Sequence, residues 1–109
     1  MEAAWRVTTL NAAVDAELEA LPDDMVARLR RLGELIQSQG LERVRQPHVK
    51  HLEGRLWGIR LIARDGIARA IYVTARGRLV VIVRVFVKKT QRTPRHEIEL
   101  ALRRAEDVR

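Results

Sequence analysis

The stretch from residue 79 to residue 87 constrains the fold more than any other part of the chain. Its sequence, Leu-Val-Val-Ile-Val-Arg-Val-Phe-Val, has no polar residue before Arg84. A run of β-branched residues is typical of a strand buried on both faces, near the middle of a sheet. Lys88 and Lys89 follow at once. We therefore expect a rigid central strand that delivers a cluster of cations to one edge of the sheet.

A helix is predicted directly after this strand. Thr93 suits the N-cap, because its hydroxyl can accept a free helix N–H, and Pro94 suits the first helical position. We expect the helix to run from about Pro94 to Glu106, with three apolar side chains facing inward: Ile98, Leu102 and Ala105.

The first 40 residues predict a short strand and a helical hairpin. Trp5–Leu10 is the strand candidate, and Asn11 is expected to cap a helix over residues 12–21. Pro22 ends that helix. A second helix is expected over residues 23–39, opened by two aspartates in its positive first turn and stopped by Gly40.

Three consecutive strands are expected after an irregular, basic segment at residues 41–55, where Pro47 argues against a continuous helix. They cover residues 56–63, 67–74 and 79–87, with two-residue turns at Asp65-Gly66 and Arg76-Gly77. The fold class is α+β: an N-terminal strand and helical hairpin packed on a largely antiparallel sheet, followed by a C-terminal helix. We expect one domain over residues 1–109, with its helices on one face of the sheet.

The two turns predict a cluster of arginines on one face of the sheet. The first turn makes Arg60 and Arg69 diagonal neighbours, and the second places Arg69 directly opposite Arg84. Such arginines repel one another, by a few tenths to about 1 kcal/mol for each close pair, which favours an anion-binding face over a merely solvated one. Strand alternation adds Phe86 and Lys88 to this face. The other face is expected to carry Trp57, Ile59, Leu61, Tyr72, Val81, Val83 and Val85.

Charge is unevenly distributed along the chain, whose net charge is +7. Residues 1–40 hold four basic and seven acidic side chains, which gives a net charge of −3. Residues 41–109 hold seventeen basic and seven acidic side chains, which gives a net charge of +10. This asymmetry suggests a polyanionic partner for the second part. The alternative is a basic surface that has no dedicated partner.

Composition excludes several classes of site. The chain has no cysteine, which rules out a disulfide framework and a thiolate metal site. His48 and His51 have the spacing of a metal-binding pair, but no further ligand accompanies them. We expect no metal and no cofactor, and interpret this segment as a basic loop or a nucleic-acid contact. His96 is either a general acid or base or an ordinary exposed helix histidine.

Hydropathy points to a soluble, cytoplasmic protein with no membrane partner. Charge breaks every apolar run well short of the roughly 20 residues that span a bilayer. The N-terminus lacks a basic region followed by an apolar one, so no signal peptide is expected.

Several segments carry a resemblance to a known family. They are Leu56-Trp-Gly-Ile-Arg60, Gly66-Ile-Ala-Arg-Ala-Ile-Tyr72, Phe86-Val-Lys-Lys-Thr-Gln-Arg-Thr-Pro94 and Glu97-Ile-Glu-Leu-Ala101. Over about residues 47–105 the chain resembles the phage-derived, HigB-like toxins of the RelE/ParE superfamily. The resemblance implies a RelE-like fold and the toxin half of a type II toxin–antitoxin pair. Members of this type are generally ribosome-dependent endonucleases that cut mRNA, and a partner antitoxin, often a helix-turn-helix DNA binder, neutralises them.

The resemblance also implies roles for particular residues. Arg69 matches the arginine of the family's Tyr-Arg-x-x-Tyr-like strand motif, Arg60 that of its Trp-x-x-Arg motif, and Lys88 and Lys89 its lysine pair. The chain departs from the family pattern at Ala68, where an aromatic residue is common, and at Gly58, where a glutamate is common.

Together these observations predict an endoribonuclease. We expect the catalytic residues to be Arg60, Arg69, Arg84 and Lys88, with the arginines holding phosphate oxygens and a lysine of lowered pKa moving a proton. The expected RNA contacts are Lys50, His51, Lys89 and Arg92. The alternatives are a non-catalytic RNA- or DNA-binding module, or a superfamily member that poisons gyrase.

Overall fold

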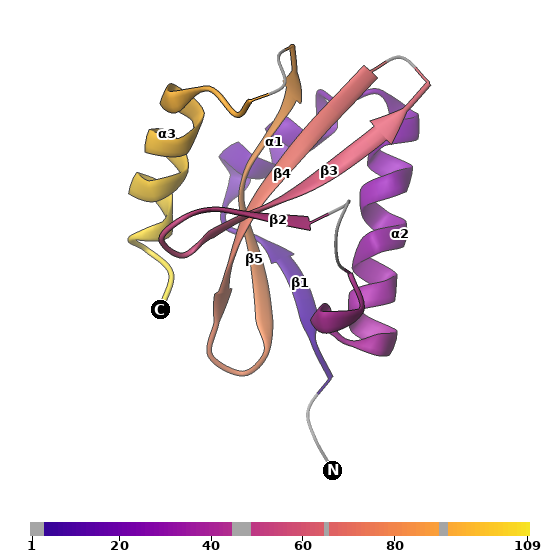
Figure 1. Ribbon diagram of the computed structural model, residues 1–109. Coiled ribbons are helices and arrows are strands. Elements are labelled where there is room, and N and C mark those ends of the chain that lie inside the picture. The colour runs from indigo at the N-terminus through magenta and orange to yellow at the C-terminus, as the bar shows by residue number, and fades with distance from the viewer. Residues whose placement is uncertain (1–3, 45–48, 65, 90–91) are drawn as a thin grey trace.

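A five-stranded sheet with the strand order β1-β5-β4-β3-β2 runs through the molecule (Figure 1). The structure is a computed structural model that describes residues 4–44, 49–64, 66–89 and 92–109. β1 pairs with β5 in parallel, and every other described pairing is antiparallel. The interior position expected for the apolar strand is confirmed, because β5 lies between β1 and β4, although β4 is the central strand. The strands are β1 (Arg6–Thr9), β2 (Val49–Glu53), β3 (Leu56–Ala63), β4 (Gly66–Ala75) and β5 (Leu79–Lys88).

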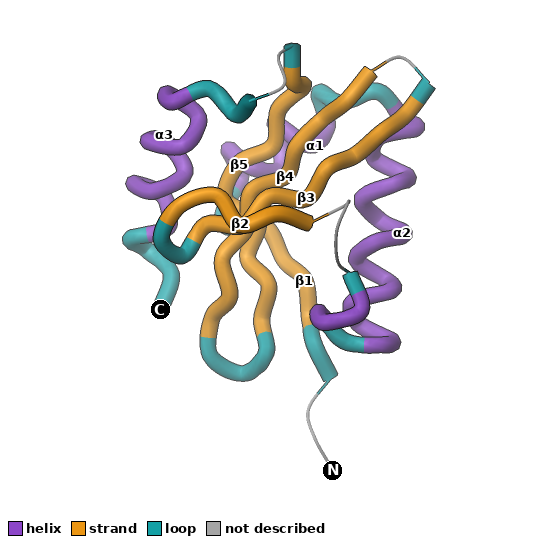
Figure 2. The backbone as a smooth tube through the Cα atoms, in the orientation of Figure 1, coloured by secondary structure: helices purple, strands orange, loops and turns teal. Residues whose placement is uncertain are grey.

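Helices cover both faces of this sheet, as the purple segments of Figure 2 show. They are α1 (Ala12–Glu19), α2 (Asp23–Gln39) and α3 (Arg95–Ala105), with a short 3₁₀ turn at Leu41–Arg43. Buried side chains of α1 and α2 pack on one face, and those of α3 pack on the other. The α+β class and the largely antiparallel sheet are confirmed, but the expectation of a single helical face is wrong. β4 and β5 are apolar on both faces, so both faces must be covered.

The helix ends follow local chemistry. The Asn11 side chain accepts the Val14 N–H at 3.1 Å, which confirms the cap of α1. The Thr93 cap is wrong: Pro94 occupies the N-cap with an extended backbone, and α3 begins at Arg95. The Pro94 carbonyl accepts the first helical N–H bonds, from Glu97 and Ile98. Of the described helices, not one combines the length and the apolar character that a membrane span requires.

Both proline caps have the same backbone geometry. Pro22, the N-cap of α2, has φ −55° and ψ 147°, and Pro94 has φ −58° and ψ 145°. In this extended conformation a proline precedes the first helical turn and does not belong to it. At the other end of α2, Gly40 has φ 98°, a left-handed value that favours glycine and stops the helix. The expected bounds of α2 are therefore confirmed.

The segment expected to be irregular contains a strand. β2 pairs with β3 from Val49 to Glu53, with a bulge between His51 and Glu53. Its sequence, Val-Lys-His-Leu-Glu, has too few apolar residues to give a clear alternation, because β2 lies at the edge of the sheet. Pro47 lies outside the described residues.

The first hairpin has a different register from the one expected. Ala63 pairs with Gly66, so Gly66 belongs to β4 rather than to a turn, and Asp65 lies outside the described residues. Arg60 is therefore directly opposite Arg69 and not diagonal to it. The difference amounts to two residues in the pairing, which preserves the face of every side chain.

The second hairpin contains a bulge that the sequence did not predict. Ile71 pairs with Arg84 and Tyr72 pairs with Ile82, which leaves Val83 as the extra residue. Arg69 is consequently opposite Phe86, and its expected position opposite Arg84 is wrong. The bulge also explains a second error: two side chains that were expected on the same face as Val85 pack under α3 instead, Val81 and Val83.

Charged side chains cover the part of β5 that extends beyond β1. The pairing with β1 ends at Ile82. Beyond it, Arg104 of α3 donates to the Val83 carbonyl at 2.8 Å, and the Val85 N–H donates to Glu17 of α1 at 3.1 Å. Side chains thus satisfy backbone groups that would otherwise form an open strand edge.

The same side chains form an ion network that joins α1, β5 and α3. Arg84 Nε lies 2.6 Å from Glu97 Oε1, and Arg84 Nη1 lies 2.9 Å from Glu17 Oε2. Arg104 Nη2 lies 2.8 Å from the same Glu17 oxygen. Because the network is only slightly exposed, removing one member leaves charges that water screens poorly.

Glu17→Gln should lower the free energy of unfolding by about 2 kcal/mol. This value lies between about 1 kcal/mol for an exposed ion pair and 3–5 kcal/mol for breaking a buried one. The matched control is Glu19→Gln, an exposed position on the same helix, which should change stability by less than about 0.5 kcal/mol. Urea unfolding of the three proteins measures both effects, and equal changes would contradict the structural role of Glu17.

The contribution of Glu17 should also depend on pH. Burial alone would raise the pKa of Glu17, but the hydrogen bonds from Arg104 and Val85 and the charges of Arg84 and Arg104 hold that pKa below its ordinary value. The stabilisation is therefore complete above the unfolded-state pKa and is lost as the pH falls through the lower folded-state pKa. The difference in stability between wild type and Glu17→Gln should shrink in acid.

Candidate functional site

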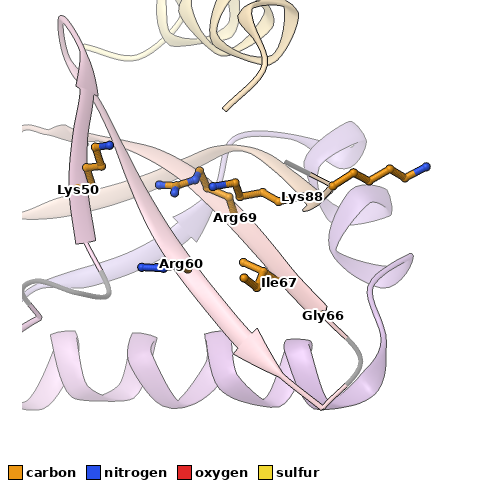
Figure 3. Close-up of a pocket in the computed structure, with 7 residues that line it drawn as sticks. Lys50, Arg60, Gly66, Ile67, Arg69 and Lys88 are labelled. Atoms are coloured by element: carbon orange, nitrogen blue, oxygen red, sulfur yellow. The ribbon is translucent and has the colours of Figure 1, made fainter. Parts of the chain in front are cut away.

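A cluster of cations lines a cavity at the end of the sheet where β4 begins and β5 ends (Figure 3). The cavity has a volume of about 570 Å³. Each of four neighbouring strands contributes one basic side chain to it: Lys50 from β2, Arg60 from β3, Arg69 from β4 and Lys88 from β5. Gly66, Ile67 and Lys89 complete the lining.

Strand pairing brings these cations together on one face. Arg60 is opposite Arg69, and Lys88 is opposite Ile67, two residues before Arg69. Residues two apart on a strand share a face, so Arg60, Arg69 and Lys88 all project from the face on which α3 packs. The predicted cluster of Arg60, Arg69 and Lys88 is thus present in the structure.

Arg69 is the most unusual member of the cluster. It is only 6% exposed, and within the described part of the chain its Nε and Nη1 atoms have no hydrogen-bond partner. Burial, together with the charge of Arg60, lowers the pKa of Arg69. A buried guanidinium without a partner is costly, and it is explained most simply by an anion that binds there.

Gly58 makes room for this side chain. A Cβ atom at position 58 would lie 2.5 Å from Arg69 Nη1 and 3.0 Å from Arg69 Cδ. In the sequence, Gly58 stood out only as a departure from the family pattern, and the space that it leaves for the Arg69 side chain was not predicted. The available signal was a glycine inside a strand, which often marks a close approach.

Lys88 lies among like charges. Burial lowers the pKa of Lys88, and the charges of Arg69, Arg60 and Lys50 lower it further. Figure 3 shows the Lys88 side chain extending toward Arg69. An ammonium group in this setting releases its proton more readily than an exposed lysine does, which suits a general acid.

Arg84 does not line this cavity, although the sequence placed it beside Arg69. Its guanidinium binds Glu97 and Glu17, and the hydrogen bond to Glu97 is the main cause of its raised pKa. Both partners come from helices, Glu17 from α1 and Glu97 from α3. The charge of Arg84 is therefore neutralised by these two carboxylates, and Arg84 contributes to the stability of the fold.

The expected RNA contacts divide between two cavities. Lys50 and Lys89 line the main cavity, whereas Arg92 and His51 line a neighbouring one of about 300 Å³ that shares Lys50 and Arg69 with the first. The His51 ring is already engaged: its Nε2 lies 2.8 Å from the Gly54 carbonyl, and its centroid lies 4.9 Å from that of Trp57.

The histidines and carboxylates offer no metal site in the described residues. No group of three or more potential ligands comes together there. His48 lies outside the described residues. His96 is exposed on α3, with its Nε2 atom 3.7 Å from Glu97. The polar side chains that line the main cavity are those of lysine and arginine.

Comparison with known proteins identifies related sequences and folds. Residues 16–106 match a family model described as phage derived protein Gp49-like (DUF891). The fold is similar to that of a chain in the crystal structure of the archaeal RelE-RelB complex from Pyrococcus horikoshii OT3, with a TM-score of 0.54 and 18% sequence identity. That alignment covers 79% of this chain and 97% of the other. No curated protein matches. The RelE-like fold expected from the sequence is confirmed.

Arg69→Met should raise the free energy of unfolding by about 1 kcal/mol or more. Methionine keeps an unbranched apolar stem and removes a buried charge that has no described partner. The control is Arg103→Met on the exposed side of α3, which should change stability by less than about 0.5 kcal/mol. Urea unfolding provides the measurement.

The same variant tests the anion site. Inorganic phosphate should raise the melting temperature of the wild type, because a ligand that binds only the folded state stabilises it. It should raise the melting temperature of Arg69→Met much less. A destabilised Arg69→Met protein, or equal phosphate responses, would contradict an anion site at Arg69.

Proposed function

The chain belongs to the family of phage-derived Gp49-like proteins, and we propose that it is the toxin of a type II toxin–antitoxin pair that cuts ribosome-bound mRNA. The observation that carries this proposal is the Arg69 guanidinium, which is buried beside Arg60 and Lys88 in one cavity and whose Nε and Nη1 atoms have no hydrogen-bond partner among the described residues. A phosphodiester would offer negatively charged oxygens to these two atoms.

The proposed reaction is an intramolecular transesterification of RNA. The ribose 2′-hydroxyl attacks the adjacent phosphorus, loses its proton to water, and the bond from phosphorus to the 5′-oxygen breaks. The products are a 2′,3′-cyclic phosphate and a free 5′-hydroxyl. Negative charge accumulates on the phosphorane oxygens in the transition state, where preorganised cations lower the barrier most.

Each cation has a proposed role in this reaction. Arg69 and Arg60 donate to the non-bridging phosphate oxygens, since a guanidinium can make paired hydrogen bonds to them. Lys88 gives its proton to the departing 5′-oxygen, in keeping with its lowered pKa. Lys50 and Lys89 attract the flanking backbone of the message.

The ribosome contributes orientation in this proposal. Holding the 2′-hydroxyl in line with the scissile bond can supply several kcal/mol. We further propose a cognate antitoxin, of the helix-turn-helix type implied by the sequence resemblance, and a cytoplasmic site of action, where ribosomes and mRNA are present. The RelE-like fold supports the pairing, because the similar chain comes from a RelE-RelB complex.

A non-catalytic nucleic-acid-binding module is the second candidate, favoured by the basic cavity alone. The position of Lys88 beside Arg69 and Arg60 favours the ribonuclease, because a lysine of lowered pKa suits proton donation, whereas simple binding of RNA does not require one.

Induced expression provides the direct test of cleavage. The wild type should stop growth and create new mRNA 5′ ends within translated regions. Arg69→Ala should abolish both effects, whereas Arg103→Ala, which removes the same charge from the exposed side of α3, should not. Growth arrest without new 5′ ends would show a toxin of another kind, and a fully toxic Arg69→Ala would reject the site.

Lys88 should be more important for the reaction than Lys89. Lys88→Gln should slow cleavage of ribosome-bound message about a hundredfold, a typical loss for one preorganised charge contact. Lys89→Gln is the matched control and should cause a smaller loss. Antitoxin binding by each variant reports correct folding, and equal small losses would remove Lys88 from the mechanism.

The pH dependence separates proton donation from simple charge. If Lys88 is the acid, the wild-type rate should fall as the pH rises through its lowered pKa, below the ordinary lysine value of 10.5. Lys88→Arg keeps the charge but does not release a proton in this range. It should therefore be slow and should lack this alkaline decline. An Arg variant as fast as wild type would assign Lys88 to charge stabilisation only.

A further inference from the structure

A smaller basic cavity adjoins the main one and has no part in the reaction described above. Its volume is about 200 Å³, and Arg60 borders both cavities. We propose that this cavity is a second phosphate subsite, which holds the backbone of the same RNA strand one or more nucleotides away from the scissile bond. The proposal rests on the proposed function and extends it. The lining consists of Arg28, Arg31, Leu32, Arg60, Leu61 and Ile62.

The packing of α2 on β3 creates the cavity. α2 presents an apolar stripe that includes Met25, Leu29 and Ile36 to the sheet and leaves Arg28 and Arg31 exposed. The described pairing of β2 with β3 reaches Ile59, one residue before Arg60. Arg28 and Arg31 of α2 therefore meet Arg60 at this margin of β3.

The arginines of this cavity are not neutralised by the described part of the protein. Arg28, Arg31 and Arg60 form no ion pair with any residue that the structure describes. Asp24, one helical turn before Arg28, instead accepts the Arg64 N–H at 3.1 Å. Arginines three apart on a helix repel each other modestly. An external anion would offset this repulsion.

The apolar part of the lining fits a nucleotide. Ile62 is 48% exposed, an unusual position for a large apolar side chain, and it lies beside the three arginines. A nucleotide offers a phosphate to guanidinium groups and a sugar or base to an apolar surface. Because Arg60 is shared, one strand can occupy both cavities. These features favour RNA over an acidic protein segment, which has no need to continue into the main cavity.

Oligonucleotides that bind without being cleaved provide the test. A 2′-O-methyl dinucleotide has one phosphodiester and no nucleophile, and a 2′-O-methyl octanucleotide spans both cavities. Fluorescence anisotropy should show that the double variant Arg28→Ala with Arg31→Ala binds the octanucleotide about tenfold more weakly than wild type. Its affinity for the dinucleotide should be unchanged. Its salt dependence for the octanucleotide should also be shallower, by about 0.7 per lost phosphate contact.

Arg30→Ala is the matched control. Arg30 lies between the two arginines in sequence and carries the same charge, but it lines a different groove, between α2 and β1. It should leave the octanucleotide affinity within about twofold of wild type. The double variant should melt no lower than wild type, because it removes a repulsive pair.

The outcomes separate this subsite from the main one. An unchanged octanucleotide affinity in the double variant would overturn the second subsite, and so would an equal loss in Arg30→Ala, which would indicate a general charge effect. Loss of antitoxin binding with normal octanucleotide binding would assign the surface to a protein and overturn the proposal. Arg69→Ala reports on the main site: it should weaken binding of both oligonucleotides, and if it weakens neither, the proposed function fails as well.

Discussion

The apolar strand β5 must be covered on both faces and along its free edge, and the rest of the fold meets that requirement. α1 and α2 cover one face, α3 covers the other, and β1 pairs with the first part of the strand. Where β1 ends, Glu17 and Arg104 bind the backbone of β5 directly. Arg84, held between Glu17 and Glu97, connects the helices of the two faces. The ion network thus joins α1 and α3, whose buried side chains belong to different hydrophobic cores.

The scaffold positions the cations of the cavity, but their mutual repulsion and burial make the folded state less stable. Placing Arg60 directly opposite Arg69 is unfavourable, and burying Arg69 without a described partner is more so. The hairpin that positions them has a well-packed apolar side, which includes Ile59, Ala70 and Tyr72. Packing energy on one face of β3 and β4 therefore maintains an electrostatically strained arrangement on the other. Strain of this kind is typical of sites that are completed by a ligand.

Much of this arrangement could be predicted from the sequence, because it follows from local patterns. The apolar run fixed the position of β5, and the Asn11 cap and Gly40 stop marked helix ends correctly. Arg60, Arg69 and Lys88 were placed on one face because the pairing errors in both hairpins, at these residues, were an even number of residues. The roles of these residues in catalysis remain predictions.

The errors arose where distant parts of the chain decide the outcome. The partners of Arg84 come from helices that flank the strand only in the folded protein. The alternation of the strand alone therefore placed Arg84, incorrectly, in the cation cluster. The edge strand β2 has no strong alternation of apolar and polar residues. The local sequence also gives no signal for the bulge at Val83. The arginines of α2 belong to a segment whose net charge is negative, and only tertiary packing brings them beside Arg60.

The extra residue in β5 divides the strand into two halves with independent phases. The half before Val83 supplies side chains to both cores, and the half after it supplies Val85 and Phe86 to the cores and Lys88 to the cavity. Because Val83 is the extra residue, deleting it would leave a regular ladder in which Arg84 still pairs with Ile71 and Lys88 still pairs with Ile67. Loss of the bulge would therefore keep the cationic side chain of Lys88 at the cavity and would change only the local bend and twist of the strand.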